Sequence, residues 1–248
     1  MLYTFLMSTE RNETISLPAG ASMRALLTLP DAERPAAGWP LILAIHDAFG
    51  FSEDIGRIAR RFASHGYAAL APAVYDGAGA PVLCVVRTFR DLQARTGPAF
   101  DRIEVARAHA AALPEIDGAR LGITGFCMGG GFAMFFAARG GLKVCAPYYG
   151  DTPSSADQLR DVCPVVAGFG ALDKQFATQG ERLERHLTEL GVPHDVKIYS
   201  EVGHSYMNDF GDGAMAAIMR RTPMHAGYDE QASEDSWRRM LDFFGKHL

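Results

Sequence analysis

Gly125-Phe126-Cys127-Met128-Gly129-Gly130 separates a short strand-like run from a long apolar run. The pattern predicts a strand over residues 120–124 and a helix over residues 128–139. A side chain carried on so sharp a strand-to-helix turn requires a strained backbone, and the turn closes only when the residues two positions before and two after it are small. Glycine occupies both positions here, so we expect Cys127 to project above the sheet edge at a helix N-terminus.

Cys127 is the candidate nucleophile of this turn. A helix dipole and free N–H groups favour a thiolate over a thiol, and the N–H of Met128 would be in position to stabilise an oxyanion. The turn alone leaves other interpretations open. Gly-rich strand–helix turns also bind nucleotides or serve packing, and a buried cysteine is often just a small hydrophobic residue. The spacing is not GxGxxG, because Cys127 occupies the middle position.

Strand-like and helix-like segments alternate on both sides of this turn. Such alternation predicts an α/β fold with a mostly parallel central sheet and helices on both faces. No repeat or linker divides the chain, so we expect one domain over residues 1–248. Irregular segments are expected at residues 76–98 and 208–229, and long loops of this kind often wall a site. The predicted strands are 13–17, 22–29, 41–45, 67–71, 120–124, 143–148, 164–169 and 196–199. The predicted helices are 100–113, 128–139, 230–246, one that begins after Ser52, and a separate one that ends at Gly191.

The composition narrows the class of protein. A net charge of −5 over 248 residues provides no basic face for nucleic acid. The N-terminus lacks the basic start and long apolar run of a signal peptide, and no stretch approaches the ~20 apolar residues of a membrane span. The 4 cysteines show no CxxC spacing, and neither HExxH, HxH nor a Cys/His cluster occurs. We therefore expect a cytoplasmic protein with no metal, no cofactor, and neither nucleic acid nor membrane as a partner.

Two further residues complete a candidate catalytic triad. In α/β-hydrolases the acid follows the nucleophile in the chain and the histidine comes last. Asp173 follows the predicted strand 164–169, and His204 follows the predicted strand 196–199. Both therefore lie at the carboxyl edge of the sheet, where ligand sites form. His204 would accept the thiol proton, and Asp173 would fix the imidazole tautomer. The alternatives are a capping aspartate before Phe176 and a solvated loop histidine.

The loop His46-Asp47-Ala48-Phe49-Gly50 follows the buried strand at residues 41–45. In the α/β-hydrolase fold this position supplies the second N–H of the oxyanion hole. Ala48 is the candidate donor, and Asp47 would lie close to the nucleophile. A capping role within the loop is the alternative for Asp47.

With these residues in view, the chain resembles the dienelactone hydrolase (carboxymethylenebutenolidase) family over residues 39–248. The cysteine in the elbow is the specific part, because most α/β-hydrolases carry serine there. The resemblance implies a triad of Cys127, Asp173 and His204 whose thiolate opens a cyclic enol-lactone, after which water releases the acyl-enzyme. The motifs that carry it are Ala44-Ile-His-Asp-Ala-Phe-Gly50, Gly66-Tyr-Ala-Ala-Leu-Ala-Pro72, Gly125-Phe-Cys-Met-Gly-Gly130, Gly170-Ala-Leu-Asp173, Tyr199-Ser-Glu-Val-Gly-His-Ser205 and the closing Trp237-Arg-Arg-Met-Leu-Asp-Phe-Phe244.

Two positions depart from the family pattern. The family has glutamate in the slot of Asp47, where it holds the thiol proton in the free enzyme, and aspartate is one methylene shorter. The family has arginine in the slot of Asn208 to bind a substrate carboxylate, and a neutral amide cannot form a charge-assisted pair. Arg87 and Arg90 are candidates for the missing cation, and Phe49 is a further candidate substrate contact.

The function expected from these residues is hydrolysis of an enol-lactone or related ester of low molecular weight. A broader carboxylesterase acting on neutral esters is the alternative suggested by Asn208. A thiol protein without hydrolytic activity, such as a redox sensor or ligand-binding relative, is a third possibility.

Overall fold

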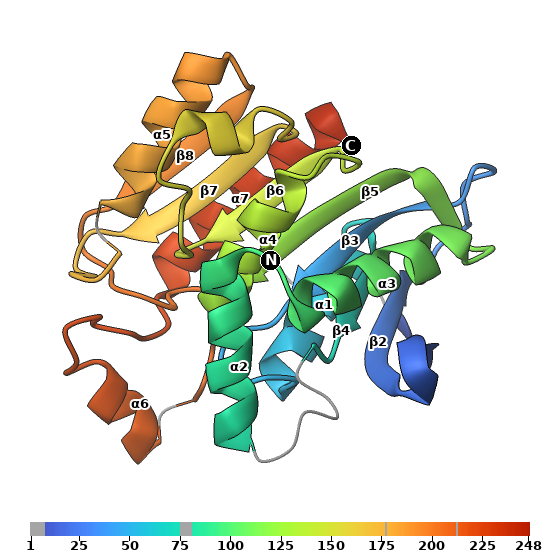
Figure 1. Ribbon diagram of the computed structural model, residues 1–248, viewed down its shortest axis with the longest axis horizontal. Coiled ribbons are helices and arrows are strands. Elements are labelled where there is room, and N and C mark those ends of the chain that lie inside the picture. Colours follow the sequence, from blue (N-terminus) through green and yellow to red (C-terminus); the bar gives the residue numbers. More distant parts are fainter. Residues whose placement is uncertain (1–7, 75–80, 177, 212) are drawn as a thin grey trace. The chain divides into compact units, whose positions relative to one another are not determined.

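The computed structural model describes residues 8–74, 81–176, 178–211 and 213–248 and falls into two compact units, Met1–Ile123 and Thr124–Leu248 (Figure 1). Strands and helices alternate in each unit, which confirms the expected α/β class. The border between the units falls within strand β5 (Ile116–Phe126), and this strand ends one residue before Cys127.

The first unit contains four strands that are hydrogen-bonded in the order β1 (Ser8–Ser16), β2 (Ser22–Pro30), β4 (Ala68–Pro72) and β3 (Trp39–Ile45). The β1–β2 and β2–β4 pairs are antiparallel, and the β3–β4 pair is parallel. Every residue of β3 and β4 is buried, as expected of strands that are covered on both faces. The helices of this unit are α1 (Glu53–Ala63), α2 (Pro81–Ala94) and α3 (Pro98–Ala112).

The second unit contains the end of β5 and three parallel strands in the order β6 (Val144–Tyr148), β7 (Val165–Gly170) and β8 (His194–Tyr199). Helix α4 (Met128–Ala137) is buried at all of its 10 positions, which explains its almost entirely apolar sequence. Helix α7 (Glu230–His247) passes behind β6 and β7 in Figure 1 and buries Trp237, Met240 and Phe244. The remaining helices of this unit are α5 (Gln179–Leu190) and α6 (Ala214–Met219).

The expectation of an irregular segment at residues 76–98 is wrong, because most of it is helical, whereas the described residues of 208–229 are irregular apart from one short helix. Helix α2 occupies most of 76–98, although residues 75–80 lie outside the described part of the chain. Its apolar pattern is a poor signal, because Val86 and Phe89 are 44% and 46% exposed while Thr88 is buried. Helix α6 interrupts 208–229, and with six residues it is too short to produce a periodic pattern.

No helix in the part of the chain that the structure describes is both long enough and apolar enough to cross a membrane.

Gly168 of β7 is expected to tolerate no side chain. A Cβ there would lie 2.1 Å from the hydroxyl oxygen of Tyr206, which is itself hydrogen-bonded to Ser236 Oγ at 2.9 Å. Gly168→Ala should therefore lower the free energy of unfolding by about 1–3 kcal/mol, the usual cost of overpacking, as measured by urea denaturation.

Gly245→Ala in α7 is the matched control, because a Cβ at that position has no heavy atom within 4 Å. It should leave the stability unchanged or raise it by up to ~1 kcal/mol through helix propensity. Equal stabilities of the two variants would contradict this account of β7.

Candidate active site

The turn between β5 and α4 holds Cys127 in a conformation that L-residues rarely adopt, with φ 56° and ψ −119°. A Cβ at Gly125 would lie 2.0 Å from the carbonyl oxygen of Gly129, so this crossing requires glycine. The amide of Cys127 donates a hydrogen bond to the carbonyl oxygen of Tyr148 at 3.1 Å. The sharp strand-to-helix turn expected from the sequence is therefore present.

Cys127 differs in exposure from the other two cysteines whose side chains are described. It is partly exposed, whereas Cys145 and Cys163 are buried. Burial raises the pKa of the Cys163 thiol to about 12 and raises the pKa of the Cys145 thiol well above its ordinary value. Of the three, Cys127 is thus the thiol that a small molecule can reach.

Asp173 follows β7 and uses its two carboxylate oxygens for different purposes. Oδ1 accepts hydrogen bonds from the amides of Gln175 at 3.0 Å and Phe176 at 3.2 Å. Oδ2 accepts a hydrogen bond from Nδ1 of His204 at 2.6 Å. Asp173 therefore caps its own turn, as the alternative expected, and also accepts a hydrogen bond from the imidazole of His204.

His204 is 1% exposed, so the alternative of a solvated loop histidine is wrong. Its amide donates to the carbonyl oxygen of Met224 at 2.8 Å, and its carbonyl oxygen accepts from the amide of Gly227 at 3.0 Å. The same segment contacts the turn of Asp173, since the amide of Lys174 donates to Pro223 at 3.2 Å. The stretch 223–227 thus joins the loops that carry the acid and the histidine.

Two aromatic rings contact the imidazole of His204. The Tyr149 ring meets it edge-on with 5.1 Å between centroids, and the Phe176 ring lies tilted against it at the same distance. The Nε2 atom makes no hydrogen bond of ordinary geometry within the described residues, although Cys127 is near enough to change the imidazole pKa. Hydrogen bonds of catalytic groups are often long before substrate binds. The structure thus brings together the three side chains of the expected triad.

The environment of His204 favours its protonated form. Burial by itself lowers the pKa, but the neighbouring Cys127 and the hydrogen bond to Asp173 outweigh it and raise the pKa from 6.5 to about 9. Because the folded-state pKa lies above the unfolded value, the stability that this protonation contributes is fully present below pH 6.5 and is lost as the pH rises through 9.

Met128, the expected oxyanion donor, is the first residue of α4. In the first unit, Asp47 is 4% exposed, and its Oδ1 accepts a hydrogen bond from the amide of Phe49 at 2.8 Å. The capping role considered for Asp47 is therefore real. Ala48 follows it in this loop, and Phe49 is 60% exposed.

His46 fixes the start of the same loop through both ring nitrogens. Nε2 accepts a hydrogen bond from the amide of Val74 at 3.2 Å, so Nδ1 must carry the proton that is shared with the carbonyl oxygen of Asp47 at 2.9 Å. Both bonds form together only when His46 is neutral and in this one tautomer.

The candidate substrate contacts are in different environments. Asn208 is 2% exposed, and its Oδ1 accepts a hydrogen bond from the Tyr149 hydroxyl at 2.6 Å. Arg87 and Arg90 are exposed on α2. Tyr149 and Phe176 are not among the site residues predicted from the sequence, although both contact His204. A signal exists for Tyr149, which directly follows β6 at the edge where ligands bind in parallel sheets.

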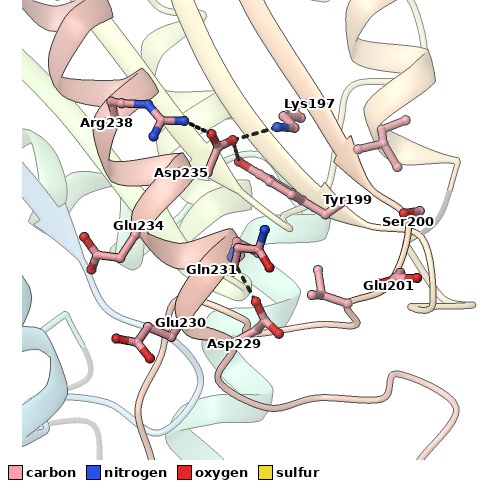
Figure 2. Close-up of a pocket in the computed structure, with 13 residues that line it drawn as sticks. Lys197, Tyr199, Ser200, Glu201, Asp229, Glu230, Gln231, Glu234, Asp235 and Arg238 are labelled. Carbon is pink, nitrogen blue, oxygen red and sulfur yellow. Dashed lines mark hydrogen bonds and ion pairs between the residues drawn. The ribbon is translucent and has the colours of Figure 1, made fainter.

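Among the described residues, no group of three or more His, Cys, Asp or Glu side chains could hold a metal ion. A groove of about 810 Å³ lies between the end of β8 and the first turns of α7, and none of the triad residues lines it. Figure 2 shows Asp235 in this groove, where it pairs with Lys197 at 2.7 Å, accepts from Tyr199 Oη at 2.9 Å and contacts Arg238. This groove is a polar surface feature and not the triad site.

The family model named Dienelactone hydrolase family matches residues 23–248. The chain belongs to the dienelactone hydrolase family. The resemblance read from the motifs is thereby confirmed, and so is the expectation of an α/β-hydrolase fold.

Relatives and solved structures of this family cover most of the chain. Proteins named "Putative carboxymethylenebutenolidase" occur in Yersinia pestis, with 26% identity over 95% of this chain and 88% of that protein, and in Methylorubrum extorquens, with 28% identity over 86% and 75%. A "Putative Dienelactone Hydrolase" of Klebsiella pneumoniae has a TM-score of 0.74 at 25% identity and covers 96% of this chain and 100% of its own. A dienelactone hydrolase-like promiscuous phosphotriesterase from metagenomic libraries shares the fold with a TM-score of 0.79 at 22% identity, covering 97% and 98%.

His204 of this dienelactone hydrolase family member should titrate near pH 9 in the parent protein. Cys127→Ala removes a group that raises the pKa, so the pKa of His204 should fall. An NMR titration of the labelled imidazole measures both values. Cys163→Ala is the control and should leave the titration of His204 where it was, whereas an unchanged value in Cys127→Ala would place the sulfur out of reach of the ring.

Proposed function

We propose that this member of the dienelactone hydrolase family opens an enol-lactone or a related carboxylic ester through Cys127, His204 and Asp173. The observation that carries the proposal is the buried 2.6 Å hydrogen bond from His204 Nδ1 to Asp173 beside a cysteine held on a strained turn. Such a buried pair suits a histidine that serves a nucleophile. With Nδ1 bonded to Asp173, Nε2 is the ring atom that exchanges a proton with the thiol.

The first half of the reaction forms a thioester. Nε2 of His204 takes the proton of the Cys127 thiol, and the sulfur attacks the ester carbonyl carbon. An S–C bond forms and the carbonyl electrons move onto oxygen. When the carbonyl re-forms, the C–O bond to the ring or leaving-group oxygen breaks, and that oxygen receives the proton from His204 as an enol or alcohol.

The second half returns the free enzyme. Nε2 of His204 accepts a proton from water while the water oxygen bonds to the thioester carbon. The C–S bond then breaks, the acid leaves, and the sulfur recovers its proton from His204. In the thioester the sulfur carries no charge, so the contribution of Cys127 that raises the pKa of His204 is absent at this stage. The pKa of the imidazole is therefore lower at this stage than in the free enzyme, which favours its acting as a base toward water.

The oxyanion formed in both halves needs hydrogen-bond donors. Met128 is the first residue of α4, and the N–H groups at a helix N-terminus point out of the helix toward a developing negative charge. Ala48 as the second donor stays a prediction from its loop position in the α/β-hydrolase fold, and Asp47 as the partner of the thiol stays one from the family resemblance. The assignment of the whole chain to one domain also stays a prediction, based on the lack of a repeat or linker in the sequence.

A broader carboxylesterase activity on neutral esters is the second candidate. It is favoured by Asn208, whose neutral side chain is buried and bound to Tyr149 at the position where the family uses arginine. The third candidate, a thiol protein without hydrolytic activity, has no need of the Asp173–His204 hydrogen bond.

Cys127→Ala should reduce turnover of a lactone and ester panel by on the order of 10³-fold or more, because it removes the nucleophile. Cys163→Ala removes a buried thiol outside the site and should retain the activity of the parent. Activity of Cys127→Ala within a few-fold of the parent would end the proposal.

Substrate charge separates the two hydrolase candidates. We expect kcat/KM for a neutral lactone or aryl ester to equal or exceed that for a carboxylated dienelactone, because an amide at position 208 offers no charge-assisted pair. Steady-state kinetics on matched substrates with and without the carboxylate measure the ratio. A preference of 100-fold or more for the carboxylated lactone would favour the narrow dienelactone hydrolase instead.

A further inference from the structure

Tyr149 links Asn208 to the imidazole of His204. Its hydroxyl donates to Oδ1 of Asn208 at 2.6 Å, and its ring meets His204 edge-on at 5.1 Å between centroids. Tyr149 is fully buried and Asn208 is 2% exposed. The hydrogen bond between Tyr149 and Asn208 is thus buried, and it lies next to the catalytic histidine of the proposed reaction.

The backbone of Tyr149 is held in an unusual conformation. It follows the last residue of β6 with φ 39°, and its amide donates to the carbonyl oxygen of Gly168 at 2.9 Å. The ring also packs edge-on against Tyr206 at 5.1 Å. A non-glycine residue at positive φ costs free energy and persists only where its surroundings fix it. The position of the Tyr149 ring is therefore set from the backbone, from Tyr206 and from Asn208.

A second aromatic ring, that of Phe176, also contacts the imidazole of His204. Phe176 packs against His204, and its amide is bound to Oδ1 of Asp173 at 3.2 Å. The Nδ1 bond to Asp173 fixes one edge of the ring but leaves rotation about that bond open. The contacts with the Tyr149 and Phe176 rings restrict this remaining freedom, because the imidazole rotates against both.

We propose that Tyr149 and Asn208 form a positioning pair that holds the imidazole of His204 in line with Cys127. The proposal rests on the proposed function and gives position 208 a role other than substrate binding. The side-chain oxygen of Asn208 is used to bind Tyr149, the residue that contacts the catalytic histidine. Misplacement of a catalytic group by about 1 Å can cost up to 10²-fold in rate, so loss of this pair should be seen in turnover.

The test compares Tyr149→Phe, Asn208→Leu and the double variant with the parent on a neutral aryl ester. Tyr149→Phe keeps the ring and removes the hydroxyl, and Asn208→Leu removes its acceptor while keeping the same branched skeleton of heavy atoms. Each single variant should lower kcat about tenfold with KM within twofold, by the positioning argument. The double variant should lose little more than either single variant, because both remove the same interaction.

Tyr199→Phe is the matched control. It also removes a tyrosine hydroxyl with two hydrogen-bond partners, Asp235 and Ser236, and its ring contacts Tyr206 and Lys197. It should keep the parent kcat. The proposal is overturned if Tyr149→Phe keeps the parent kcat, if Tyr199→Phe loses as much, or if the two single effects multiply in the double variant. A raised KM at unchanged kcat in Asn208→Leu would also overturn it, because position 208 would then be a substrate contact.

A second measurement decides the proposal even if the parent hydrolyses no ester or lactone. The rate at which iodoacetamide alkylates Cys127 at pH 7 depends on removal of the thiol proton by His204. This rate should fall about tenfold in Tyr149→Phe and Asn208→Leu and stay unchanged in Tyr199→Phe, again by the cost of misplacing the imidazole. If the parent hydrolyses no ester or lactone but shows this pattern of alkylation rates, the proposed function is contradicted and the positioning pair is supported. Equal alkylation rates in all variants would contradict the proposal of a positioning pair.

Discussion

The backbone conformation of Cys127 is the constraint on which the remaining structure depends. A φ of 56° turns the chain from β5 into α4 within one residue, and a Cβ at Gly125 would collide with the Gly129 carbonyl oxygen at 2.0 Å. The strain has to be offset by the surrounding contacts, among them the hydrogen bond from the Cys127 amide to the Tyr148 carbonyl oxygen. In return the thiol stands partly exposed at the start of a helix, while the other described cysteines lie in the core.

His204, in contrast to the partly exposed Cys127, is almost completely buried. Its two backbone polar groups bond to the stretch 223–227, Nδ1 bonds to Asp173, and Tyr149 and Phe176 cover the ring. Enclosure disfavours a charged imidazole, and the neighbouring acid and sulfur reverse that effect. In the proposed reaction the contribution of the sulfur to this raised pKa is lost once the thioester forms, which favours the base form of the ring when water reacts.

Much of the site could be predicted from the sequence because its chemistry is carried by short local patterns. Glycines around Cys127 and the positions of Asp173 and His204 directly after apolar runs are sufficient to place three loops at one sheet edge. Helix α2 was not predictable, since Val86 and Phe89 lie exposed and obscure its periodicity. The Tyr149–Asn208 bond was not predictable either, because it joins residues 59 positions apart and depends on side-chain conformations in two loops.

The closed bond between Tyr149 and Asn208 also bears on how such a site could diverge. A lineage that exchanges Asn208 for a side chain reaching toward a substrate deprives the buried Tyr149 hydroxyl of this acceptor, and such a loss typically costs about 1–3 kcal/mol. An earlier exchange of Tyr149 for phenylalanine takes this donor away from the buried Asn208 oxygen and carries a cost of the same kind. The effect of a change at either position therefore depends on the residue at the other, so a new role for position 208 is expected to require a change at position 149 as well.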